Sequence, residues 1–162
     1  MKKKSIILGT VAVIALILLF NSAFVVHPNE TVSILQFSKI ISIKEKTGLY
    51  FKVPFIQSTQ RVSTKTVLYD IPASDVITKD KKSMTADNYV LWKVRDSKKY
   101  IQTLGANSER ANERVEAAVF NATKNVISSM TQDEVIAARG ETLTTKITEQ
   151  ANTDIGEYGI DI

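Results

Sequence analysis

The sequence contains no cysteine and only one histidine, His27, among its 162 residues. The lack of cysteine excludes disulfides, thiolate nucleophiles, and zinc or iron–sulfur sites built on cysteine ligands. A single imidazole cannot form a multi-histidine metal site, and a Ser-His-Asp triad would have to use His27. His27 directly follows a long apolar run, which places it poorly for meeting a distant serine. We therefore expect no metal, no cofactor and no enzymatic activity.

The sequence also lacks a cluster of positive charge in its main part. It has 21 Lys and Arg residues against 17 Asp and Glu residues, a net charge of +4. Lys2, Lys3 and Lys4 stand ahead of the apolar run, which leaves 18 basic residues against the 17 acidic ones. Nucleic-acid binding needs clustered basic side chains that follow the phosphates. We therefore expect no nucleic-acid partner.

The longest stretch of the sequence without a charged side chain is the apolar run near its N-terminus. Residues 5–26 contain no charged side chain, and 17 of the 21 residues from Ile6 to Val26 are apolar. As a helix, 21 residues extend roughly 31 Å, close to the hydrocarbon thickness of a bilayer. The pattern predicts a transmembrane helix over residues 5–26. A cleaved signal peptide is an alternative, although Asn21 would then occupy a position that favours a small residue. A buried soluble helix is the third reading.

The flanking charges predict the orientation of this helix. Three lysines precede it, and no Lys or Arg follows until Lys39. By the positive-inside rule, residues 1–4 form a cytoplasmic tail and residues 27–162 lie outside the cytoplasm.

The first half of this exported region has the alternation of strands. In the strongest example Val90, Trp92 and Val94 share one face, whereas Tyr89 and Leu91 share the other, which predicts a strand covered on both sides. Gly48, in the turn before Leu49, permits the positive φ of a tight turn. The predicted strands are Glu30–Phe37, Lys39–Glu45, Leu49–Val53, Val67–Ile71 and Asp87–Val94.

The second half has helical periodicity. Apolar residues recur at three- and four-residue spacing between Asn107 and Met130, and Thr131 with Glu134 has the form of a capping box. Strands followed by helices indicate an α+β domain over residues 27–162. The other predicted helices are Asp96–Leu104 and Glu141–Tyr158, and Ile160–Ile162 is expected to begin a strand.

Four sequence blocks occur in a recognisable order after the apolar run. Together they resemble the band 7, or SPFH, family (stomatin, prohibitin, flotillin and HflK/C). Within that family the HflC branch is most similar, because HflK-type members carry a longer, glycine-rich N-terminus. The likeness runs from about residue 20 to residue 162. The blocks are FVVHPNETVSILQFSKI (24–40), GLYFKVPFI (48–56), DVITKDKKSMTADNYVLWKVRD (75–96) and DEVIAARGE (133–141).

The resemblance implies a function as well as a fold. It implies an antiparallel-rich sheet with helices packed on it, anchored in the plasma membrane of a bacterium. An HflC-like subunit would assemble with an HflK-like partner around an FtsH-type membrane protease and limit substrate access sterically. A stomatin-like organiser of lipids or of another membrane protein is the alternative. Family members continue into a further strand and a coiled coil that drives homo- or hetero-oligomer formation, and this sequence ends at Ile162.

The resemblance also suggests a surface that touches the lipid bilayer. The expected membrane-interface residues are Phe24, Val25, Phe51, Phe55 and Ile56, although a core position for Phe51 and Phe55 is an equally open interpretation. The stretch Lys79–Lys82 is either a patch facing head groups or a partner, or a solvated loop. If the protein were an enzyme, its catalytic pair would be Ser83 with Lys81 or Lys82, or Asp75 with Asp80.

Overall fold

The first strand of the protein lies where the sequence predicts the end of a helix. The computed structural model describes residues 22–162, and in it Ala23–Val26 form strand β1. Phe24 and Val26 are buried, whereas Ala23 and Val25 are exposed. This alternation is the one expected of a strand with one buried face. The predicted helix end at Val26 is therefore wrong, and the rest of the predicted span, residues 5–21, lies outside the described residues. Within residues 22–162, no helix is both long and apolar enough to cross a membrane.

The chain divides into two units, with the boundary between Ser63 and Thr64. The prediction of a single domain over residues 27–162 did not anticipate this boundary. Each unit has its own core: Phe24, Val26, Val32 and Ile34 cluster in unit 1, and Val76, Ile127 and Val135 cluster in unit 2. We describe the units separately.

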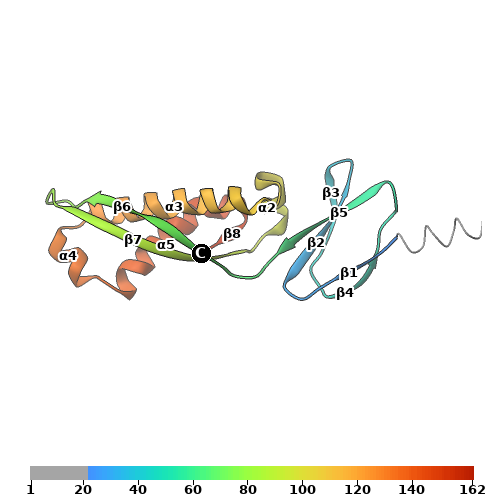
Figure 1. Cartoon of the computed structure of the whole chain (residues 1–162), viewed down its shortest axis with the longest axis horizontal. Helices are drawn as coiled ribbons and strands as arrows, with labels where there is room; N and C mark the ends of the chain where they lie inside the picture. Colours follow the sequence, from blue (N-terminus) through green and yellow to red (C-terminus); the bar gives the residue numbers. More distant parts are fainter. Residues whose placement is uncertain (1–21) are drawn as a thin grey trace, which may run out of the picture. The chain divides into compact units, whose positions relative to one another are not determined.

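The described part of unit 1, residues 22–63, is built from strands (Figure 1). Strand β1 pairs antiparallel with β4 (Gly48–Phe51), and Phe24 stacks on Tyr50 with ring centroids 6.0 Å apart. The second sheet has the order β3-β2-β5, formed by Lys39–Lys44, Glu30–Gln36 and Gln57–Ser63 respectively. Gly48 does not use the positive φ that a glycine permits, since the glycines with positive φ in the described chain are Gly105, Gly140 and Gly159.

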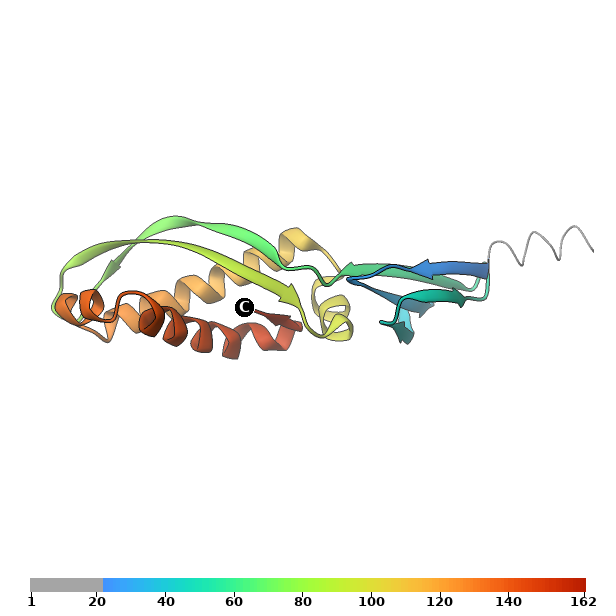
Figure 2. The same ribbon diagram turned by 90° about the horizontal axis from the view of Figure 1, so that it is seen from below.

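Unit 2 combines a long hairpin with helices. Strands β6 (Val67–Ile77) and β7 (Ser83–Val94) pair antiparallel, and β8 (Ile160–Asp161) pairs with the end of β7. In Figure 2 the long helices α3 and α5 lie together on one side of the curved hairpin. The helices are α2 (Ser97–Leu104), α3 (Ser108–Ser128), α4 (Gln132–Ala137) and α5 (Glu141–Ile155), followed by the 3₁₀ turn η1 (Gly156–Tyr158).

The α+β prediction is confirmed, and local signals explain where the helices begin. Asp96 and Asn107 accept hydrogen bonds from the free backbone N–H groups of α2 and α3. The capping box of Thr131 and Glu134 is present at the start of α4. Gly159 ends η1 with φ 74°.

The prediction that β7 is covered on both faces is wrong. Val90, Trp92 and Val94 are buried, but Tyr89 and Leu91 on the other face are exposed. The β6–β7 hairpin is two-stranded over most of its length, and α3 packs on β6. Tyr89 and Leu91 border an open hollow between β7, α3 and α5, where they remain in contact with solvent.

The stretch Lys79–Lys82 turns between β6 and β7 and is tied to α4. The Thr78 hydroxyl donates to Asp80 (2.6 Å), and the backbone N–H of Gln132 donates to the same carboxylate oxygen (3.1 Å). Together with the Lys82 ammonium, these donors lower the pKa of Asp80 to about 2, with the Thr78 hydrogen bond as the largest cause. The Asp80 carboxylate thus joins this turn to the start of α4.

Candidate membrane-facing surface

The outer face of the β1–β4 ribbon is apolar and exposed. The register pairs Val25 with Leu49 and Ala23 with Phe51, so these four side chains share the face opposite the unit 1 core. Phe51 is 64% exposed. Phe24 was predicted to lie on the exposed surface with Val25. Because side chains alternate along β1, Phe24 instead lies on the opposite face and is buried.

The connection from β4 to β5 extends this apolar surface. Phe55 is 90% exposed, and Val53 and Ile56 are exposed beside it. The loop is held by two hydrogen bonds to Gln57, whose backbone N–H donates to the carbonyl of Val53 (3.0 Å) and whose Oε1 accepts from the Val53 N–H (2.8 Å). The loop therefore has a defined shape while its aromatic ring stays in solvent.

The turn between β2 and β3 brings a third aromatic ring to the same place. Phe37 is 83% exposed, and Gln36, its neighbour in the chain, pairs with Gln57 of β5. Because Ile56 precedes Gln57, that pairing sets Phe37 beside Ile56 at one end of the three-stranded sheet. We call Phe37, Phe51, Val53, Phe55 and Ile56 the apolar tip.

The apolar tip also lies where the described chain begins. The backbone N–H of Lys52 donates to the carbonyl of Ser22 (2.8 Å), and the Ser22 hydroxyl donates to the carbonyl of Lys52. Figure 1 shows the start of β1 and the β4–β5 connection at the same end of unit 1. Ser22, near the end of the apolar run, is thus hydrogen-bonded to Lys52, the residue from which the loop with the exposed rings continues.

Two of these rings are held in a costly backbone conformation. Phe37 has φ 49° and Phe55 has φ 69°, a left-handed region that bulky residues rarely adopt. Such a residue costs on the order of 1–2 kcal/mol relative to glycine. Exposed rings add a solvation cost, and contiguous exposed apolar patches mark interaction surfaces.

Sequence reasoning found part of this surface. Four of the predicted surface residues are exposed: Val25, Phe51, Phe55 and Ile56. The alternative interpretation, that Phe51 and Phe55 belong to the core, is therefore wrong. Phe37 and Leu49 were missed. Phe37 becomes part of the surface only through the pairing of β2 with β5, a strand whose polar sequence gave no signal.

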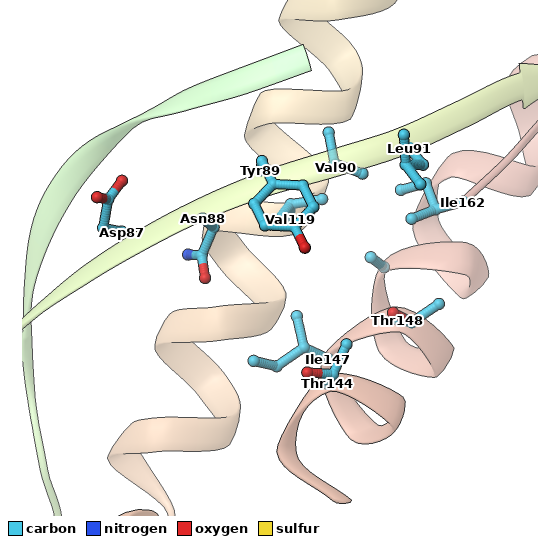
Figure 3. Close-up of a pocket in the computed structure, with 11 residues that line it drawn as sticks. Asp87, Asn88, Tyr89, Val90, Leu91, Val119, Thr144, Ile147, Thr148 and Ile162 are labelled. Atoms are coloured by element: carbon cyan, nitrogen blue, oxygen red, sulfur yellow. The ribbon is translucent and has the colours of Figure 1, made fainter. Parts of the chain in front are cut away.

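Unit 2 has a pocket of about 490 Å³ between β7, α3 and α5 (Figure 3). Val90, Val119 and Ile147 line it with other apolar and hydroxyl-bearing residues. Asp87 and Tyr89 are the ionisable side chains among its lining residues.

The two carboxylates considered for catalysis, Asp75 and Asp80, each have a hydrogen-bond partner within unit 2. Asp75 accepts a hydrogen bond from the Thr85 hydroxyl (2.9 Å) across the hairpin, and Asp80 is occupied by Thr78 and Gln132. Within residues 22–162, no three His, Asp or Glu side chains are grouped so as to hold a metal ion. The exposed apolar surface of unit 1 remains the most distinctive feature.

The two-unit α+β fold corresponds to a known class of protein. The family model described as "SPFH domain / Band 7 family" matches residues 24–162, so the chain belongs to that family. Among curated relatives, "Modulator of FtsH protease HflC" of Escherichia coli (strain K12) is 25% identical over 158 residues. That alignment covers 93% of this chain and 47% of the relative.

A second relative agrees with the first. "Protein HflC" of Buchnera aphidicola subsp. Schizaphis graminum is 28% identical over 144 residues, covering 84% of this chain and 47% of its own length. The chain thus spans about half the length of the curated relatives it matches.

Proposed function

We propose that this protein is an HflC-like scaffold subunit of the bacterial plasma membrane. With an HflK-like partner it modulates an FtsH-type membrane protease by controlling sterically which substrates reach it. The observation that carries this proposal is the alignment of relatives named HflC, one of them as a modulator of FtsH protease, along most of this chain.

The proposed placement uses the apolar run and the apolar tip together. The part of the run that precedes β1 spans the bilayer with the three lysines in the cytoplasm, and the rest of the chain lies outside. Unit 1 rests on the outer leaflet through its exposed rings, which removes their apolar surface from water. The Lys52–Ser22 hydrogen bond supports this placement, since it holds the chain between Phe51 and Val53 beside a residue near the end of the run.

A steric role needs no catalytic residues. The protein would act by occupying space around the protease, with its position set by the anchor and its neighbours set by surface contacts. We accordingly propose that it is not an enzyme. Purified full-length chain that cleaved casein, and lost that activity on Ser83→Ala, would contradict this.

Affinity purification tests the proposed partners. The chain, tagged at its C-terminus, is isolated from gently solubilised membranes of the bacterium that encodes it and read by mass spectrometry. An unrelated single-pass membrane protein with the same tag is the control. We expect enrichment of both an HflK-like protein and an FtsH-type protease. Recovery of the HflK-like protein alone would contradict the protease role.

The exposed apolar surface also supports a second candidate, a stomatin-like organiser of membrane lipids. In that case neither partner would be enriched, and the half-life of a membrane substrate of the protease would not change when the gene is deleted. Under the FtsH-modulator proposal the same half-life shortens, because access to the protease is no longer restricted.

A further inference from the structure

The charged residues of unit 1 are distributed unevenly. Its described part contains five basic residues and only two acidic ones, Glu30 and Glu45. Glu30 is engaged by Arg61 (2.8 Å) and by His27 (3.0 Å), at the end of β2 opposite the Phe37 turn. Both acidic residues are therefore separated from the apolar tip by the length of a strand. The basic residues are Lys39, Lys44, Lys46, Lys52 and Arg61.

Two lysines lie at the apolar tip without an acidic neighbour in the chain. Lys39 follows the Phe37 turn and is exposed, and Lys52 lies between Phe51 and Val53. No Asp or Glu occurs in residues 31–44 or in residues 46–69. The ion pairs within residues 22–63 join Glu30 to Arg61 and His27, and none of them involves the tip lysines. The tip is thus an apolar surface bordered by positive charge.

This arrangement matches the outer boundary of an anionic bilayer. Aromatic rings settle at the level where head groups meet acyl chains, and lysine stems extend along apolar surface while the ammonium group reaches the phosphates. An anionic surface attracts each nearby lysine enough to change binding about fivefold. Two lysines together give a preference on the order of 30-fold at low salt.

We propose that the apolar tip docks on anionic phospholipid head groups, with Phe37 and Phe55 at the acyl boundary and Lys39 and Lys52 on the phosphates. This inference rests on the proposed membrane-facing role of unit 1. It adds a chemical selectivity that an apolar surface alone would not have, because rings insert equally well beneath neutral and anionic head groups.

The absence of cysteine allows a direct test. The full chain with Ile56→Cys carries one environment-sensitive NBD label at the tip, and Thr47→Cys carries the same label at the exposed β3–β4 turn as a control. Each protein is placed in nanodiscs of pure phosphatidylcholine, or of phosphatidylcholine with about a third phosphatidylglycerol. We expect a larger blue shift at residue 56 in the anionic discs, decreasing at high salt, and no difference at residue 47.

Matched charge variants locate the effect. Lys39→Gln with Lys52→Gln is expected to lower the ratio of immersed to exposed tip by about 30-fold in anionic discs. Lys44→Gln with Lys46→Gln removes the same charge at the other end of unit 1 and is expected to leave the ratio unchanged. If both pairs have equal effects, the tip lysines are not the determinant and the proposal fails.

The remaining outcomes separate this inference from the proposed function. An equal blue shift at residue 56 in both kinds of disc would overturn the selectivity while leaving the membrane-facing surface intact. The absence of any blue shift in either disc would overturn the membrane-facing surface as well.

Discussion

Gly159 provides a sharp test of how unit 2 is held together. Its φ of +74° is in the left-handed region, and a Cβ at this position would lie 2.3 Å from the carbonyl oxygen of Asp96. Its own carbonyl accepts hydrogen bonds from the N–H groups of Arg95 (2.9 Å) and Asp96 (3.0 Å). Gly159→Ala therefore introduces backbone strain and a collision at the point where the chain enters β8.

The expected destabilisation can be built up from these contacts. Left-handed backbone at an alanine costs roughly 1–2 kcal/mol relative to glycine. Relieving the collision must move Gly159 away from Asp96, which weakens two hydrogen bonds of about 0.5–1.5 kcal/mol each. The total is roughly 2–5 kcal/mol, lost from the free energy of unfolding of unit 2.

Gly105→Ala is the matched control. Gly105 has nearly the same φ, +67°, but a Cβ there would meet no atom within 4 Å. This variant carries only the backbone strain of roughly 1–2 kcal/mol. The comparison isolates the collision from the left-handed conformation.

The single tryptophan makes the assay specific to unit 2. Trp92 is buried in β7, next to the residues that pair with β8, so its fluorescence reports the unfolding of this unit. Urea titrations of the full chain in mild detergent give the free energies for wild type and both variants. Gly159→Ala values within about 0.5 kcal/mol of Gly105→Ala would refute the reasoning, because that is the range of an ordinary surface substitution.

Two further predictions concern unit 2. Ile127→Ala should lower the free energy of unfolding by about 2–5 kcal/mol in the same urea assay, because Ile127 is buried, whereas exposed Ile136→Ala should change it by less than about 0.5 kcal/mol. Equal effects of the two would contradict the core assignment. The low pKa of Asp80, about 2 instead of 3.8 and held mainly by the Thr78 hydroxyl, means that its stabilising contribution is full above pH 4 and is lost as pH falls toward 2. The stability difference between wild type and Asp80→Asn should therefore shrink over that interval, and a constant difference would show that the carboxylate charge does not matter.

The sequence predicts the elements of unit 2 well because their signals are local. Asn107 and the Thr131–Glu134 capping box lie next to the backbone groups that they satisfy, so spacing along the chain is enough to locate the helix starts. The family resemblance rests on the same kind of local information, in short blocks and their order.

Several features of unit 1 had no such signal. Strand β5 contains one buried apolar residue, Val62, and forms because β2 offers it a free edge along seven residue pairs. Residues 23–26 continue an apolar run, yet they form a strand because β4 pairs with them. In both cases the partner strand decides the structure, and the partner is distant in sequence.

The candidate surface divides in the same way. By itself the sequence determined that Phe51, Phe55 and Ile56 lie close together beyond the apolar run, and that no acidic residue accompanies them between residues 46 and 69. Tertiary structure alone decided that Phe24 faces the core, that Phe37 joins the others through the pairing of Gln36 with Gln57, and that Lys39 comes with it. The physical reason is that side-chain direction in a sheet depends on strand register, and register is fixed by contacts between segments far apart in the chain.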